Sequence, residues 1–214
     1  MVSSQDLLVL FVGLELQALP LYILAAFKRQ SLRSSEAGVK FFVLGALSSG
    51  LLLYGCSLIY GATGSIHFED IKVSVDLENS WILLLGLGFI ISGMAFKISA
   101  VPFHMWAPDV YEGSPTPSTL FLASVPKLAA LSMTARLLTS GFEDFLTGWQ
   151  QILTILAISS IYFGSIAAIA QTNIKRLLAY SSISHMGFAI IGLACASPDG
   201  LAAMISYLIV IFVV

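Results

Sequence analysis

The sequence predicts an all-α membrane protein that crosses the bilayer about seven times. Hydrophobic residues make up 57% of the 214 residues and charged residues only 10%, whereas ordinary soluble domains are about 25% charged. Apolar runs long enough to span a bilayer recur along the chain. Because backbone polar groups in lipid must be satisfied within the protein, these runs are predicted to be helices.

The expected helices follow one another without a low-complexity linker, so the whole chain, residues 1–214, is interpreted as a single transmembrane domain. Their approximate bounds are 6–27, 38–60, 81–112 (broken), 118–139, 151–171, 174–196 and 200–214. The last run is still apolar at Val214, so we expect a helix that is cut short.

The connections predict an orientation in the membrane. Basic residues gather between the first two helices and again around Lys175 and Arg176, and both segments are expected on the cytoplasmic side. The acidic connections then lie on the other side, together with the amino terminus. In one of them, residues 71–78 alternate between apolar and polar, a period typical of a half-buried strand. We therefore expect a short extracytoplasmic hairpin at 65–78.

Several classes of function are not suggested. The net charge is −2 and no basic patch is interleaved with aromatic residues, so no nucleic acid partner is expected. Cys56 and Cys195 both lie in apolar runs without the spacing of metal ligands, and we interpret them as small core residues. No metal site is predicted.

Four ionisable residues fall near the centres of predicted helices: Glu15, Lys97, Lys127 and His185. A charge at the bilayer centre costs roughly 2.5–3.5 kcal/mol on insertion scales, so such residues are rare, usually paired, and typical of ion pathways. Glu15 and Lys97 alone could be an inert buried ion pair. A second lysine and a histidine on separate helices favour a pathway for protons or another small cation.

Prolines accompany these residues. Pro102 follows Lys97 by five positions, and the apolar stretch 81–112 is longer than one straight span requires, so a helix break is predicted near Lys97–His104. Pro126 directly precedes Lys127 and is predicted as a second break. Broken helices at membrane depth free backbone groups that many transporters use in ion sites.

These residues predict a proton relay. A buried lysine that gains and loses a carboxylate neighbour can take up and release a proton, and histidine changes charge near neutral pH. Packed helices lie about 8–10 Å apart, so some steps would need a bridging water.

The same stretches resemble a known family, the antiporter-like membrane subunits of NADH:quinone oxidoreductase (respiratory complex I), and most closely those of the subunit N type. The resemblance rests on 13–22 (GLELQALPLY), 95–97 (AFK), 102–113 (PFHMWAPDVYEG), 126–127 (PK), 173–187 (NIKRLLAYSSISHMG) and 40–46 (KFFVLGA). It covers essentially the whole chain.

The resemblance implies roles and surroundings. Glu15 and Lys97 would be the coupling ion pair, Lys127 the central relay lysine, and His185 a step towards a second half-channel. Proton transfer would be driven by quinone reduction elsewhere in a complex that holds NAD(H), FMN, iron–sulfur clusters and quinone, with no cofactor in this chain. Its partners would be other membrane subunits, the lipid bilayer and protons, in a bacterial inner membrane or, for an organellar protein, the mitochondrial inner membrane.

The resemblance also implies that the chain is partial. The family fold consists of two inverted repeats, and this sequence begins where the family's fifth helix begins and stops within the eleventh. The lysine of the second broken helix is absent. We therefore expect a domain that is incomplete at both ends and that does not pump alone.

Two other functions stay open from the sequence. One is a subunit of a multi-subunit Na⁺/H⁺ antiporter, which shares the fold and the glutamate–lysine pair. The other is a non-translocating structural membrane subunit in which Glu15 and Lys97 form a fixed salt bridge, because buried pairs can often be exchanged for apolar residues without harm.

Overall fold

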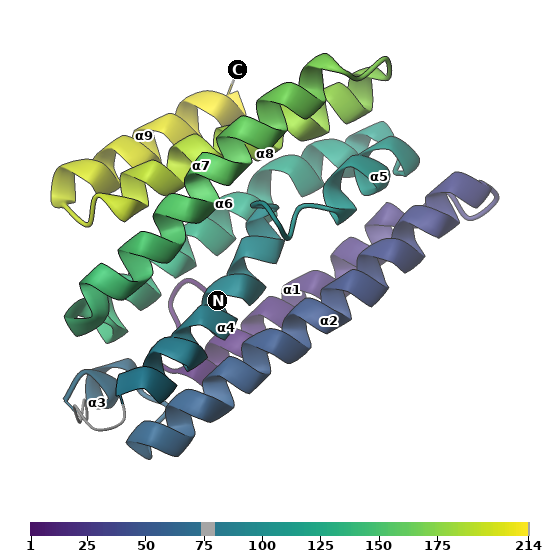
Figure 1. Ribbon diagram of the computed structural model, residues 1–214. Helices are drawn as coiled ribbons and strands as arrows, with labels where there is room; N and C mark the ends of the chain where they lie inside the picture. Colours follow the sequence, from purple (N-terminus) through teal and green to yellow (C-terminus); the bar gives the residue numbers. More distant parts are fainter. Residues whose placement is uncertain (74–79, 214) are drawn as a thin grey trace.

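The protein is a bundle of long helices, seen in a computed structural model that describes residues 1–73 and 80–213 (Figure 1). The elements are α1 (Leu7–Ala25), α2 (Leu32–Thr63), α3 (Phe68–Val73), α4 (Ser80–Ile98), α5 (Trp106–Gly113), α6 (Thr116–Gly141), the 3₁₀ turn η2 (Glu143–Phe145), α7 (Leu146–Ile169), α8 (Ile174–Ala194) and α9 (Pro198–Val213). Across the described ranges, six helices are long and apolar enough to cross a membrane, and α9 is a shorter apolar helix. The predicted multi-pass helical fold is confirmed.

The helices form two outer groups with a central group between them. In Figure 1, α1 and α2 (purple to blue) lie on one side and α7, α8 and α9 (green to yellow) on the other, with α4, α5 and α6 between. Helix α2 packs against α1, α4 and α5, while α8 packs against α7, α9 and α5. On α7, Gly164 lets the backbone of α8 approach so closely that an added Cβ would stand 2.7 Å from the Ser184 nitrogen. The central helices therefore contact both outer groups.

The break in the third predicted span is present, between the end of α4 at Ile98 and the start of α5 at Trp106. Ser99 has a positive φ of 59°, which ends the helix. The backbone groups that the break frees find side-chain partners: the Val101 amide donates to Ser160 Oγ on α7 at 2.9 Å, and Trp106 Nε1 donates to the Phe96 carbonyl at 2.8 Å. Such partners are what make irregular backbone tolerable at membrane depth.

The break predicted at Pro126 is wrong. Helix α6 runs from Thr116 to Gly141 with Pro126 inside it. A proline removes one backbone donor, but neighbouring helices and hydroxyl side chains can compensate within a membrane bundle. Pro126 is itself buried in that packing.

The predicted hairpin is also wrong over the residues that the structure describes. Phe68–Val73 form the short helix α3, which packs against α6. Phe68 and Ile71 are buried, and Glu69 and Asp70 occupy the first turn, where the helix dipole favours acidic side chains. Of the residues assigned to the second strand, 74–78 lie outside the described ranges. Tertiary burial of Phe68 and Ile71 at helical spacing outweighs the local period of two.

Two helices, α2 and α7, begin about five residues or more before their predicted starts. Helix α2 starts at Leu32 instead of residue 38, and Ser34 near this start donates a 2.9 Å hydrogen bond to the Ala25 carbonyl at the end of α1. Helix α7 starts at Leu146 instead of residue 151, with Trp149 buried and bonded to the Phe142 carbonyl. Polar helix ends outside an apolar run leave no hydropathy signal, so contacts with the preceding element set these starts.

The two basic segments lie at the same end of the bundle, as predicted. Asp109 on α5 forms ion pairs with Lys40 of α2 at 2.9 Å and Arg176 of α8 at 2.7 Å. At the opposite end, Lys72 of α3 pairs with Glu143 at 2.5 Å, and this hydrogen bond raises the pKa of Lys72. The assignment of the basic end to the cytoplasm stays a prediction.

Candidate functional site: buried lysines and a helix break

Glu15 and Lys97, predicted to pair, come together in the structure. The Nζ atom of Lys97, one residue before the end of α4, lies 3.7 Å from Oε1 of Glu15 near the middle of α1. The side chains are 13% and 29% exposed, respectively. Ser49 on α2 donates a short hydrogen bond to the same Glu15 oxygen. Three helices therefore meet at this carboxylate.

The geometry of the pair leaves the lysine incompletely satisfied. Lys97 Nζ is buried and makes no hydrogen bond within the described residues, because 3.7 Å is longer than a hydrogen bond to Glu15 would be. An unmade hydrogen bond at a buried ammonium costs free energy, because the charge has lost its water without a full replacement. The two side chains are close enough for electrostatic attraction but are not joined by a hydrogen bond.

A small cavity of about 20 Å³ borders Lys97. Its lining includes Gln17 of α1 and Pro126 and Ala130 of α6, the helix that carries Lys127. A space of this size holds about one water molecule. The cavity therefore borders both Lys97 and helix α6.

Lys127 is fully buried, at 0% exposed. Its Nζ atom lies 2.5 Å from the Ser182 hydroxyl of α8 and 5.3 Å from the ring centroid of Tyr111 on α5. Across residues 1–73 and 80–213, no carboxylate forms an ion pair with it. The environment of Lys127 is therefore unlike that of Lys97.

His185 lies on α8, three residues beyond Ser182. Its Nδ1 is 3.0 Å from the hydroxyl of Tyr207 on α9. The ring nitrogen can donate to or accept from this hydroxyl, depending on which nitrogen carries the proton. His185 thus has a partner that can exchange a proton with it.

The structure places the four predicted residues as three separate groups. Glu15 and Lys97 form one, Lys127 the second and His185 the third. No direct hydrogen bond or ion pair between these groups occurs in the described part of the chain. A proton transfer between these groups would need water or side-chain movement, and the relay through them stays a prediction.

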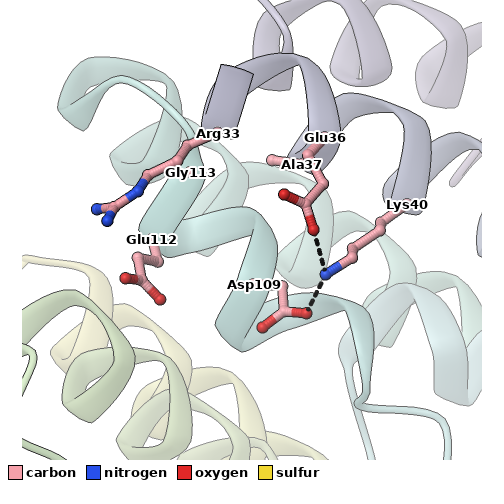
Figure 2. Close-up of a pocket in the computed structure, with 7 residues that line it drawn as sticks. All are labelled: Arg33, Glu36, Ala37, Lys40, Asp109, Glu112 and Gly113. Atoms are coloured by element: carbon pink, nitrogen blue, oxygen red, sulfur yellow. Dashed lines mark hydrogen bonds and ion pairs between the residues drawn. The ribbon is translucent and has the colours of Figure 1, made fainter. Parts of the chain in front are cut away.

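A further charged group, around Asp109 and Glu112 of α5, lies at the basic end of the bundle. We call Lys40, Asp109, Glu112 and Arg176 the Asp109 cluster. Arg176 bonds both carboxylates, at 2.7 Å and 3.1 Å. Figure 2 shows Lys40 between the carboxylates of Glu36 and Asp109, beside a cavity of about 190 Å³. The cluster ties α2 and α8 to α5, just beyond the helix break.

The side chains that contact these groups could not be predicted from the sequence. They are Ser49, Ser182, Tyr207 and the ring of Tyr111. The only signal available is a hydroxyl residue within an apolar run. That signal does not separate Ser49 from Ser48 or Ser182 from Ser181, because the rotation of each helix decides which serine faces the site.

Comparison with known proteins settles the family. A family model described as NADH:quinone oxidoreductase/Mrp antiporter, TM, matches residues 4–214. The chain belongs to this family. The NADH:quinone oxidoreductase/Mrp antiporter family thus accounts for the fold described above and confirms the resemblance that the sequence motifs predicted.

Individual members of the family are similar along almost the whole chain. NADH-quinone oxidoreductase subunit N of Pelagibacter ubique is 59% identical over 97% of this chain. A chain of respiratory complex I from Thermus thermophilus with bound aureothin is 38% identical over 97% of this chain, with a TM-score of 0.79. A chain of the Mrp complex from Dietzia shares the fold, with a TM-score of 0.85 at 24% identity.

The length of these relatives differs from that of the chain. The chain spans 44% of the Pelagibacter subunit and 45% of the Thermus chain. It is therefore a subunit N homologue that corresponds to less than half of its relatives.

Proposed function

We propose that this chain is the proton-transferring part of an antiporter-like membrane subunit of NADH:quinone oxidoreductase. Quinone reduction elsewhere in that complex would drive protons through Glu15, Lys97, Lys127 and His185. The identity of 59% to a subunit N, against 24% to an Mrp chain, supports the respiratory assignment.

The single observation that carries the proposal is the loose Glu15–Lys97 pair beside a helix break. When Glu15 is near, its charge stabilises the Lys97 ammonium. When Glu15 moves away, the buried ammonium loses its only anionic neighbour in the described ranges and releases a proton. A water in the cavity beside Lys97 can accept that proton and donate it towards Lys127 on α6.

The later steps of the relay use side chains that can both donate and accept a hydrogen bond. Lys127 as a neutral amine takes the proton on Nζ, and loses it again to water when its charge is no longer favoured. His185 and the Tyr207 hydroxyl, 3.0 Å apart, form the last described pair on the way through α8 and α9. Each N–H or O–H bond that forms at an acceptor replaces one that breaks at its donor, so no redox chemistry is needed in this chain.

The surroundings follow from the same assignment. The NAD(H), FMN, iron–sulfur and quinone chemistry would belong to other subunits, and the chain would lie in a bacterial inner membrane. Helix α1 carries exposed apolar side chains along its outer face, including Leu16 and Ile23, which suits contact with lipid or a neighbouring membrane subunit.

A second candidate is a subunit of an Na⁺/H⁺ antiporter, favoured by the shared fold with the Mrp chain and by the family's own description. The two differ in what drives transport. Respiratory transfer depends on NADH oxidation and proceeds without sodium, whereas antiport depends on a sodium gradient.

The experiment compares Lys97→Met with Lys72→Met, a matched control at an exposed site outside the spans. Membrane vesicles of cells that carry the protein in its natural complex are supplied with NADH in sodium-free buffer, and acidification and oxidation are recorded. We expect Lys97→Met to lower both by tenfold or more in an assembled complex, with Lys72→Met near the parent. Full pumping by assembled Lys97→Met would make the pair scaffolding. Acidification that requires sodium would favour the antiporter.

A further inference from the structure

Lys127 raises a physical problem that the relay does not answer. An ammonium at 0% exposure has lost its water, and such a charge normally needs a carboxylate or several hydrogen bonds. Within residues 1–73 and 80–213 no carboxylate pairs with it, whereas Lys97 has Glu15. Something else must allow Lys127 to carry a proton.

Two groups occupy the place of a carboxylate. The Ser182 hydroxyl lies 2.5 Å from Nζ, and the face of the Tyr111 ring lies 5.3 Å from it, within the range of a cation–π contact. The Tyr111 hydroxyl lies beside the same serine without a hydrogen bond of good geometry. Lysine, serine and tyrosine therefore form one compact group.

The two partners of Lys127 come from two helices that pack against each other, α5 and α8. Tyr111 is 2% exposed and belongs to α5, the helix that starts directly after the break. Ser182 belongs to α8, which packs against α5. The ion pair between Asp109 of α5 and Arg176 of α8 fixes the two helices to each other.

We propose that Tyr111 and Ser182 are positioning residues that form a carboxylate-free seat for the proton on Lys127. The serine hydroxyl serves both states of the lysine, because it accepts from the ammonium and donates to the neutral amine. The ring serves only the ammonium, because its attraction is for positive charge. The seat thus stabilises the charge without a permanent negative partner that would hold the proton. This inference rests on the proposed proton-transferring function.

The role of the Tyr111 ring is tested by lowering the electron density of the ring while its shape is kept. At position 111, phenylalanine and 3,4,5-trifluorophenylalanine are introduced by nonsense suppression, and NADH-driven acidification of vesicles is measured per assembled complex. Phenylalanine keeps the ring and should retain at least half of the parent rate. The fluorinated ring attracts cations weakly and should lower the rate about tenfold. The same pair at Tyr162, 69% exposed on α7, is the control and should show no difference.

The hydroxyl is tested with Ser182→Ala and Ser182→Thr. We expect alanine to lower the rate several-fold and threonine to restore most of it. Ser181→Ala, one residue away on α8, is the matched control. If the fluorinated variant does not assemble, this serine series decides the proposal.

The outcomes separate this inference from the proposed function. Lys127→Met is measured in parallel. If Lys127→Met stops pumping while the fluorinated ring and Ser182→Ala leave it intact, the seat is overturned and the relay stands. If Lys127→Met itself pumps normally, the relay through Lys127 is wrong. A graded loss from phenylalanine to the fluorinated ring supports the seat, because a purely structural role would not respond to ring electrons.

Discussion

Lys97 and Lys127 are both lysines at membrane depth, but the protein compensates their charges in different ways. Lys97 lies at the end of a broken helix, 3.7 Å from Glu15, in a pair that is partly exposed. Lys127 lies inside the continuous helix α6, fully buried, with a hydroxyl and an aromatic ring as neighbours. The difference shows how a chain with few charges can hold one proton by an adjustable ion pair and another by dipoles and a ring.

The largest effect on stability is expected at Lys127, because its charge has no opposite partner in the described ranges. Replacing a whole buried ion pair with apolar residues is often neutral or stabilising by about 1–4 kcal/mol, and replacing a lysine that has no ion-pair partner likewise leaves no opposite charge stranded. We expect Lys127→Met to raise the midpoint of thermal unfolding of the detergent-solubilised protein, by an amount that corresponds to about 2 kcal/mol. A midpoint that falls clearly below the parent would contradict the difference between the two lysines.

At the Glu15–Lys97 ion pair we expect a substitution to lower the free energy of unfolding instead of raising it. Lys97→Met leaves Glu15 without its cation, and we expect a loss of about 1–2 kcal/mol, less than for a fully buried pair because Glu15 is 29% exposed. Adding Glu15→Gln should recover most of this loss. A double-mutant cycle on thermal unfolding measures the coupling. Strictly additive losses would mean that the two side chains do not interact.

Ser49 offers a third test of the difference between the two lysines, because it donates a hydrogen bond to the carboxylate of Glu15. Ser49→Ala removes one hydrogen bond to the carboxylate of Glu15. We expect pumping to fall several-fold, since Glu15 loses the contact that sets its position. Ser48→Ala is the control: Ser48 is buried on the same helix but bonds the Gly93 carbonyl. If Ser49→Ala and Ser48→Ala changed pumping equally, Ser49 would have no specific role in positioning Glu15.

The smallest effect is expected at the Asp109 cluster, where the ion pairs are about one-third exposed. Asp109→Asn weakens the contacts with Lys40 and Arg176, and exposed pairs contribute about 0.2–1 kcal/mol each. We expect pumping to fall less than threefold and the loss to shrink at high salt, because exposed charges are screened. Glu36→Gln, which affects only the pair within α2, is the comparison. A complete loss of pumping in Asp109→Asn would move the cluster into the relay itself.

Much of the fold follows from the sequence, because membrane spans, charged residues within them and a proline inside an apolar stretch are all local signals. The break after Lys97 could be predicted from Pro102 and from the excess length of the span. Helix α3 could not, because its formation depends on the packing of Phe68 and Ile71 against other helices rather than on the alternating pattern.

The candidate site, like the fold, could be predicted only in part from the sequence. Glu15 and Lys97 could be paired in advance, since each is costly alone in an apolar helix. The partners of Lys127 could not, because the choice of Ser182 over Ser181 depends on helix rotation, and the ring of Tyr111 reaches Lys127 only through the packing of α5 among its neighbours.

The most direct test of the relay is the acidification of membrane vesicles during NADH oxidation with Lys127→Met in the assembled complex. The account predicts that acidification and oxidation both fall by tenfold or more, although the protein becomes no less stable. Acidification and oxidation at the parent rates in an assembled Lys127→Met complex would contradict it, because the proton would then pass without Lys127.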